Sequence, residues 1–160
     1  MKHKQTKGEV ETAIRNAIIK FEQEFMGRGP MDVKAFIIRD LVLIRLKGVL
    51  TPAERQLAKS EDGVDMVKAM RQNLITQGRE RLCAQLTEIT GASVYGLFTD
   101  IDTHIGERVI VFALDRDLES ILCWTYRSFI NNSPASIFAS RPTLPIEESL
   151  FSQFFLPASG

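Results

Sequence analysis

The chain of 160 residues carries twenty basic and twenty acidic side chains, so its formal net charge is zero at neutral pH. A neutral chain has no bulk attraction to nucleic acid or to an anionic membrane surface. Its hydrophobic content of 44% and charged content of 25% are ordinary for one globular domain with a buried core. No apolar run reaches the length of a membrane span and the start lacks a signal-peptide core, so we expect a cytoplasmic protein.

The first predicted element is a helix over residues 8–25, where apolar side chains recur at three- and four-residue spacing. A corner follows at Met26-Gly27-Arg28-Gly29-Pro30. Its two glycines supply backbone freedom, and the proline fixes where the extended segment begins. The corner is therefore either a small anion-binding nest or the hinge that turns a helix into a sheet.

Residues 33–38 and 41–46 are two β-favouring runs separated by Arg39-Asp40, which predicts an antiparallel hairpin. Apolar side chains alternate onto both faces of this hairpin, with Phe36 and Ile38 on one face and Val33 and Ile37 on the other. A sheet that is apolar on both faces needs a second covering surface. We expect a dimer partner or the C-terminal segment to supply it.

The segment Thr51-Pro52-Ala53-Glu54 has a threonine N-cap, a proline at the first helical position and a glutamate that closes a capping box. It predicts a short helix to about residue 59. A second cap signal lies at residues 60–63, and the apolar stripe then continues until Gly91, which is placed to end the longest helix.

Residues 93–101 and 107–114 form a second predicted strand pair around a four-residue loop. The order αββαββ predicts an α+β fold: a two-layer sandwich in which helices cover one face of a four-stranded antiparallel sheet. We expect this domain to span residues 7–115. The two cysteines, Cys83 and Cys123, lie on predicted helices without a metal-like spacing, so we expect reduced thiols that mainly contribute packing.

The C-terminal segment, residues 116–160, combines a predicted helix over 117–131 with a Ser- and Pro-rich tail that still holds large apolar side chains. Free solvation does not suit such residues. Docking onto the same domain, onto a dimer mate or onto another protein remain as alternatives. The candidate interaction residues are Trp124, Phe151, Phe154 and Phe155.

Two candidate ligand sites follow from the pattern of charged residues. Arg28, between Gly27 and Gly29, could line a basic groove with Arg39, Arg45 and Lys47 of the adjacent hairpin, for a small anion such as bicarbonate, phosphate or a nucleotide. The alternative is that Arg28 pairs with a carboxylate and locks the corner.

The second candidate is a cation site. Asp100 and Asp102 share one face of a strand, with Glu107 across the hairpin, which is a donor set for a divalent cation. His104 beside them is a possible ligand or general base. The alternative is a solvated strand end.

Several separated segments resemble the MpsC family, a bacterial group named for a sodium-translocating system that generates membrane potential. They are residues 7–11, the corner at 26–30, Lys47-Gly48-Val49-Leu50 with the capping box that follows, residues 89–91, residues 99–103 and residues 106–108. The resemblance covers about residues 7–115 and implies association with an ion or inorganic-carbon uptake system. A chain without a membrane span cannot translocate an ion, so the resemblance implies an accessory or regulatory protein with a membrane transport protein as possible partner.

Three functional hypotheses result. The first is a dimeric, non-enzymatic accessory protein that acts by protein–protein contacts, and the second is an anion sensor at the Arg28 corner. The third is a metal-dependent enzyme that uses Asp100, Asp102 and His104. The chain contains no Walker loop, dinucleotide fingerprint, nucleophile elbow or zinc motif, so we expect no enzyme activity and no bound cofactor.

Overall fold

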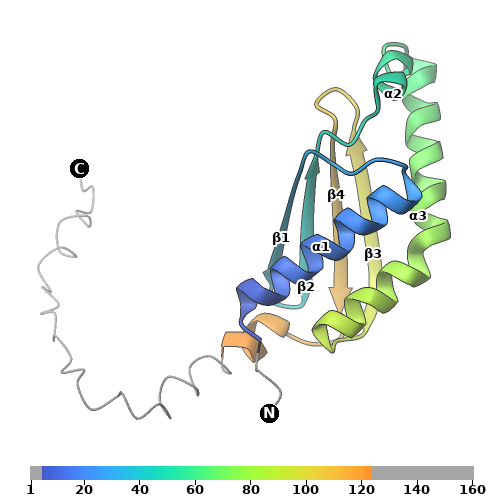
Figure 1. The fold of residues 1–160 in the computed structure, drawn as a ribbon. Helices are drawn as coiled ribbons and strands as arrows, with labels where there is room; N and C mark the ends of the chain where they lie inside the picture. The colour runs from blue at the N-terminus through green and yellow to red at the C-terminus, as the bar shows by residue number, and fades with distance from the viewer. Residues whose placement is uncertain (1–4, 124–160) are drawn as a thin grey trace, which may run out of the picture.

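The computed structural model describes residues 5–123, and Figure 1 shows them as helices packed on a four-stranded sheet. The elements in chain order are α1 (Lys7–Phe25), β1 (Asp32–Ile38), β2 (Leu41–Lys47), α2 (Pro52–Leu57), α3 (Glu61–Thr90), β3 (Val94–Asp102) and β4 (Glu107–Leu114). A further helix begins at residue 118 and continues to the end of the described part. The predicted α+β fold with αββαββ order and a C-terminal helix is confirmed.

Residues close in sequence determine the helix ends. At α2 the Thr51 hydroxyl accepts from the Glu54 amide at 3.2 Å and the Glu54 carboxylate accepts from the Thr51 amide at 2.7 Å, which is the predicted capping box. The same reciprocal pair forms at the start of α1. Helix α3 is capped by Ser60 and ends at Gly91, whose φ of +69° is the left-handed conformation that favours glycine.

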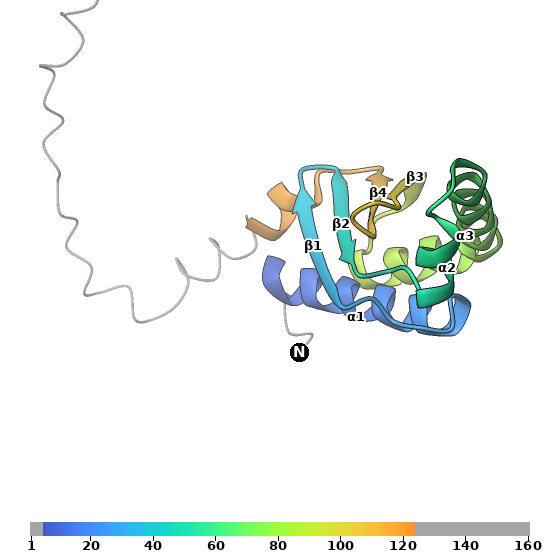
Figure 2. The ribbon, with the colours of Figure 1, turned by 90° about the horizontal axis from the view of Figure 1, so that it is seen from above.

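The strands lie in the order β1-β2-β4-β3, and every neighbouring pair is antiparallel. Seen from above in Figure 2, α1 and α3 lie on the same side of the sheet. Helix α1 packs near β1, and α3 packs near β3. The other face of the sheet, called the open face below, carries no helix within residues 5–123.

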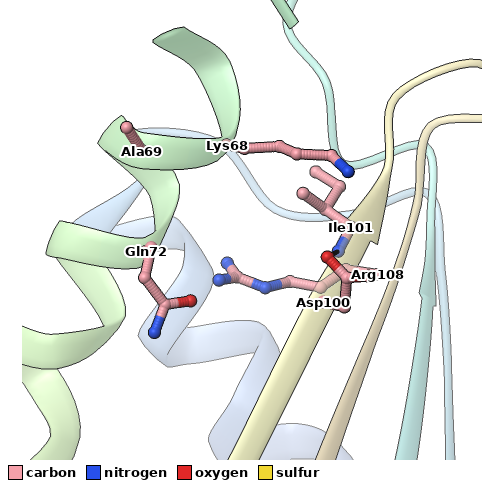
Figure 3. A pocket seen from close by; sticks show the side chains of 6 residues that line it. All are labelled: Lys68, Ala69, Gln72, Asp100, Ile101 and Arg108. Atoms are coloured by element: carbon pink, nitrogen blue, oxygen red, sulfur yellow. Dashed lines mark hydrogen bonds between the residues drawn. The ribbon is translucent and has the colours of Figure 1, made fainter. Parts of the chain in front are cut away.

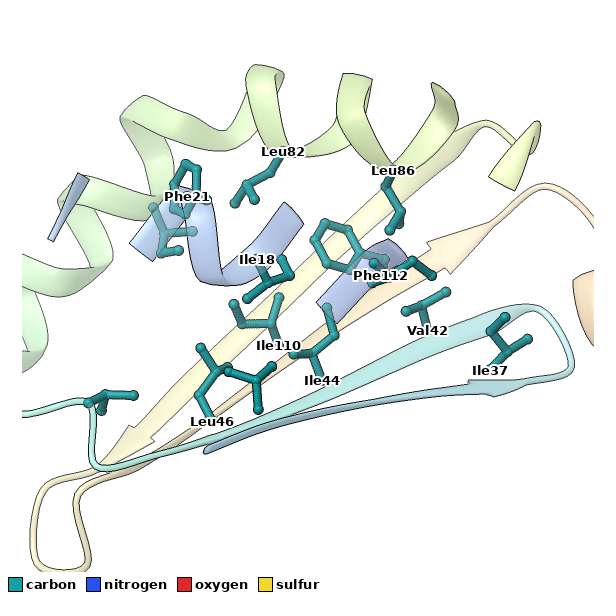
Figure 4. Packing of buried hydrophobic residues seen from close by; sticks show 14 of the residues in the cluster. Ile18, Phe21, Ile37, Val42, Ile44, Leu46, Leu82, Leu86, Ile110 and Phe112 are labelled. Atoms are coloured by element: carbon teal, nitrogen blue, oxygen red, sulfur yellow. The ribbon is translucent and has the colours of Figure 1, made fainter. Parts of the chain in front are cut away.

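The core fills the space between the two helices and the sheet (Figure 4). Because strand side chains alternate between the faces, every second residue of each strand enters this core. Leu118, at the start of the C-terminal helix, is 2% exposed and belongs to the same core. Side chains labelled in Figure 4 are Ile18, Phe21, Ile37, Val42, Ile44, Leu46, Leu82, Leu86, Ile110 and Phe112.

Helices α1 and α3 approach closely at Gly78. A Cβ atom placed on Gly78 would lie 2.4 Å from two ring atoms of Phe21, which is buried and stacks on Phe25. Only glycine leaves room for the ring at this point. The contact sets how closely α1 can pack on α3, and therefore where both helices lie on the sheet.

Candidate functional site

The open face of the sheet presents four rows of side chains, each crossing all four strands. The register places two rows without charges side by side, and we call them the apolar rows: Ile38, Leu41, Ala113 and Gly96, then Phe36, Leu43, Val111 and Phe98. The charged rows follow them along the strands: Lys34, Arg45, Val109 and Asp100, then Asp32, Lys47, Glu107 and Asp102. One half of the open face is therefore apolar and the other half is charged.

Large apolar side chains in the apolar rows are exposed. Phe98 is 64% exposed, Ile38 46% and Phe36 42%. The ring of Phe98 lies over Gly96, where its Cε2 atom is 3.1 Å from the position of a Cβ atom. Contiguous exposed apolar surface of this kind marks interaction sites in soluble proteins. The alternation read from the first hairpin therefore leads to an exposed apolar surface, as expected for a sheet that is apolar on both faces.

The signs of the charges in the charged rows divide along the middle of the sheet. The three basic side chains lie on β1 and β2, whereas β4 and β3 contribute only acidic ones. Asp32, at the start of β1, is the one acidic side chain on the basic side. Arg45 donates two hydrogen bonds to Glu107, at 2.8 and 3.0 Å, and the Lys47 ammonium lies 3.7 Å from the same carboxylate. Lys34 has no ion-pair partner within residues 5–123. The charged half thus has a positive side and a negative side.

The basic groove expected around Arg28 is not formed. Arg28 lies at the end of the sheet where β1 begins, whereas Arg39 lies in the turn at the other end of the hairpin, about 20 Å away along seven strand residues. Arg39 lies 3.7 Å from Asp117, and Arg45 points to the open face and is bound by Glu107. Strand length and the alternation of side chains separate the three guanidinium groups.

Within the corner, the Arg28 side chain donates to a backbone carbonyl, a partner that neither prediction named. The Arg28 Nη1 donates to the Leu50 carbonyl at 3.4 Å, and Arg55 donates to the same oxygen from Nε at 3.4 Å and Nη2 at 3.3 Å. No carboxylate of residues 5–123 forms an ion pair with Arg28, so the predicted alternative is also absent there. Gly27 has a φ of +71°, which explains a glycine at this position.

The predicted cation site is not assembled. Within residues 5–123 no group of three acidic, histidine or cysteine side chains is placed to hold a metal ion. Asp102 accepts from the amides of His104 and Ile105 at 2.8 and 3.3 Å, and thereby caps the hairpin turn. Glu107 is bound by Arg45 and Lys47. The carboxylate oxygens that a cation would need are therefore bound by backbone amides at Asp102 and by basic side chains of β2 at Glu107.

Asp100 lines a pocket of about 270 Å³ between α3 and β3. Figure 3 shows the guanidinium of Arg108 reaching from the sheet toward Gln72 in this pocket, with Lys68 above it. At this edge strand Asp100 lies near the cations Lys68 and Arg108, and its charge partly opposes the lowering of the Arg108 pKa by burial. The surroundings of Asp100 oppose cation binding.

A buried ion network that the sequence analysis missed lies under the sheet. Glu22, Arg71 and Arg108 are at most 2% exposed. Glu22 Oε1 lies 3.7 Å from Arg108 Nη1 and Glu22 Oε2 lies 3.9 Å from Arg71 Nη1, so the carboxylate is located between two guanidinium groups. Arg71 also donates to both Glu54 oxygens, at 2.8 and 2.9 Å, and to the Val49 carbonyl at 2.6 Å. The network joins α1, α2, α3 and β4.

Burial dominates the electrostatics of this network. Burial raises the pKa of Glu22 above its ordinary value, against the opposing charges of Arg108 and Arg71. Burial likewise lowers the pKa of Arg108 to about 10, although Glu22 opposes this. Burial would also raise the pKa of Glu54, but hydrogen bonds from Arg71 and Thr51 outweigh it and lower the pKa.

The chain did contain a signal for this network. Glu22 follows Phe21 on the buried side of α1, Arg71 occupies the buried stripe of α3 between Val67 and Ile75, and Arg108 alternates with the core residues of β4. A charged residue in register with a buried stripe requires a partner of opposite sign. Three such residues of mixed sign predict a buried network, although spacing alone does not identify the pairs.

The candidate interaction residues Trp124, Phe151, Phe154 and Phe155 lie outside the described residues, and so does the predicted helix beyond residue 123. Of the predicted histidine and cysteine positions, His104 lies exposed in the β3–β4 turn and Cys83 is half-buried on α3. Burial raises the pKa of the Cys83 thiol, which disfavours the reactive thiolate. No helix among residues 5–123 combines the length and apolar character that crossing a bilayer requires.

Comparisons with known proteins match most of the residues that the structure describes. The family model described as "Na+-translocating membrane potential-generating system (MpsC)" matches residues 6–116. The uncharacterized protein YbcI of Bacillus subtilis is 40% identical over 119 residues, covering 74% of this chain and 96% of that relative. The uncharacterized protein YrhF of the same organism is 29% identical over 107 residues, covering 66% and 88%. No solved structure matches the chain.

Proposed function

The chain belongs to the MpsC family, and we propose that it is an accessory or regulatory protein of a membrane-potential-generating, sodium-translocating system, acting from the cytoplasm through protein–protein contacts. The description of the family supports the link to such a system. Non-catalytic action is part of the proposal, because Asp102 is used to cap the hairpin turn and Glu107 is bound by Arg45 and Lys47.

The observation that carries this proposal is the exposed apolar surface of the open face. A helix covers the opposite face of the sheet, whereas Phe36 and Phe98 remain exposed on this one. Water-exposed apolar side chains lose the favourable free energy that burial would provide, about 25 cal/mol per Å². Binding a protein at the apolar rows recovers it, so this surface is suited to contacts rather than to chemistry.

A genetic experiment tests the proposal. A bacterial strain that lacks this chain is expected to develop a smaller sodium-dependent membrane potential, read with a voltage-sensitive dye at low and high external sodium. The wild-type chain and Lys59→Glu, a reversed charge in the exposed turn between α2 and α3, should restore the potential, whereas Phe36→Lys in the apolar rows should not. An unchanged potential in the deletion strain would refute the link to the system.

One observation favours a second candidate function, binding of a small anion. Arg28 and Arg55 converge on the Leu50 carbonyl, and neither forms an ion pair within residues 5–123. Two guanidinium groups near one point attract an anion. Inorganic phosphate and bicarbonate should then raise the melting temperature of the wild type but not of Arg28→Ala. Equal shifts in the two proteins would eliminate this site.

A further inference from the structure

The open face has a symmetry in its chemistry that identifies one occupant. Consider an axis that runs parallel to the strands, midway between β2 and β4. A two-fold rotation about this axis places β1 of one copy opposite β3 of the other, and β2 opposite β4, because the strand order is β1-β2-β4-β3. Under this rotation the apolar rows correspond to themselves, Lys34 corresponds to Asp100 and Lys47 corresponds to Glu107.

A two-fold axis through this line would bring two copies of the sheet face to face with those correspondences as contacts. Phe36 then lies opposite the partner's Phe98, and Leu43 lies opposite the partner's Val111. In the charged rows, Lys34 lies opposite the partner's Asp100, and Lys47 lies opposite the partner's Glu107. One pair has like charges, since Asp32 lies opposite the partner's Asp102 at the corner of the face.

We propose that the occupant of the open face is a second copy of this chain, packed sheet on sheet about that two-fold axis. Two-fold contacts require a surface that is complementary to itself, and this face has that property in its apolar half and, apart from the like-charge contact at Asp32, in its charged half. An axis across the strands would instead place the apolar rows on the charged rows. Aligned sheets that pack face to face, about 10 Å apart, bury such rows in their common core.

This inference rests on the proposed function, in which a protein binds at the apolar rows, and it identifies that protein as a second copy of the chain. The accessory protein would then act as a dimer, and the helical sides of both copies would remain available to other proteins. Lys34, which has no ion-pair partner within residues 5–123, gains one in this arrangement.

The test uses the full chain and measures its mass by sedimentation equilibrium over a range of protein concentrations. We expect about twice the chain mass of 18.0 kDa. Phe36→Lys should give the mass of one chain, because it places a charge in the apolar rows. Lys34→Glu alone and Asp100→Lys alone should each weaken the dimer about tenfold, because two-fold symmetry makes each like-charge contact twice.

The decisive variant carries both Lys34→Glu and Asp100→Lys, and it should restore the wild-type dissociation constant. The two residues lie on opposite edge strands, three strand spacings or about 14 Å apart, beyond the screening length of about 8 Å at physiological salt. The two new charges therefore cannot compensate each other within one molecule. If the double variant restores the dissociation constant, the two residues must meet across the dimer interface. Lys59→Glu, in the exposed turn between α2 and α3, is the matched control, and unchanged circular dichroism verifies the fold of each variant.

Three results would overturn the inference: a wild-type chain of 18.0 kDa at every concentration, a dimer that Phe36→Lys leaves intact, or a double variant without rescue. The proposed function fails separately. If the wild-type chain is a monomer but a strain that carries Phe36→Lys still has a reduced membrane potential, another protein covers the open face. A dimer that behaves as expected in a strain without any change in potential would refute the link to the system and leave the dimer standing.

Discussion

Arg71 on α3 connects three other parts of the molecule: α1, α2 and the segment that follows β2. It donates to the Glu54 carboxylate that also closes the capping box of α2, and to the Val49 carbonyl that follows β2. One buried guanidinium therefore holds the α2 corner against α3. Residues with several buried charged partners are costly to remove, because the partners keep their charge and lose its compensation.

We expect Arg71→Met to lower the free energy of unfolding by about 3 kcal/mol, the usual cost of breaking a buried ion pair. The measurement is urea unfolding followed by circular dichroism. Arg79→Met is the control, because Arg79 is exposed on the same helix and surface substitutions usually cost less than about 0.5 kcal/mol. Equal losses in the two variants would mean that the buried network contributes nothing specific.

Glu22 should make stability depend on pH. Its pKa is raised above the ordinary value of 4.5. As pH rises through that ordinary value, the unfolded chain loses this proton first, while the folded protein keeps it. The contribution of Glu22 to stability is therefore complete below the unfolded pKa and is lost as pH rises through the folded pKa.

Glu22→Gln isolates this effect because glutamine carries no titratable proton. The stability of the wild type minus that of Glu22→Gln should fall as pH increases from about 4 toward neutrality, measured by urea unfolding at a series of pH values. The opposing carboxylate is Glu54, whose pKa is lowered and which is present in both proteins. A difference that increases with pH would show that the guanidinium groups outweigh burial at Glu22.

At the scale of elements, the contact between α1 and α3 depends on one missing side chain. The periodicity of each helix predicted a buried stripe, and that of α1 is observed. The stripe of α3 is observed near its two ends, but in the middle it runs through Arg71, Ile75 and Gly78, and Met70, which was expected in it, is 43% exposed. Gly78 lies inside the α3 stripe, where glycine costs about 1 kcal/mol of helix stability relative to alanine. Glycine is needed here despite that cost, because the ring of Phe21 occupies the space of a Cβ atom, and only the packed structure shows this contact.

Gly78→Ala should therefore destabilise the protein, although alanine is the better helix former. The added Cβ would overlap a ring that is 1% exposed, and overpacking a core costs about 1 to 3 kcal/mol, more than the gain in helix propensity. Thermal unfolding measures the loss. Gly8→Ala in α1 is the control, since no atom lies within 4 Å of its added Cβ and it should cost nothing. A more stable Gly78→Ala would show that α1 and α3 separate freely.

At the scale of the whole molecule, a dimer through the open face would couple folding to association. Two folded chains then share a core that an unfolded chain cannot form, so mass action favours the folded state at higher concentration. The melting temperature of the wild type should increase with protein concentration, and that of Phe36→Lys should stay constant. Differential scanning calorimetry over a hundredfold range of concentration measures both. A wild-type melting temperature independent of concentration would argue against the shared core.

The fold and the functional site differ in how far sequence patterns predicted them. Helix and strand positions, the capping box at Thr51 and the exposed apolar side chains of the first hairpin all follow from residues near one another in the chain. The expected groove of Arg28, Arg39 and Arg45 does not form, because strand length and side-chain alternation place the three groups at different ends and faces. The carboxylates near Asp100 do share one face of the sheet, but Asp102 caps the hairpin turn and the basic side chains of β2 bind Glu107, so no cation site is assembled among residues 5–123.

The sequence by itself determined the αββαββ order, the family and the two-faced character of the first hairpin, because periodicity and caps act over a few residues. The strand order β1-β2-β4-β3 was decided only by the tertiary structure, through pairings between residues as far apart as Leu41 and Ala113. That order aligns the apolar rows, places all the basic side chains of the open face on one side and brings Glu22 between Arg71 and Arg108. These properties depend on which distant segments become neighbours, and local patterns do not encode that choice.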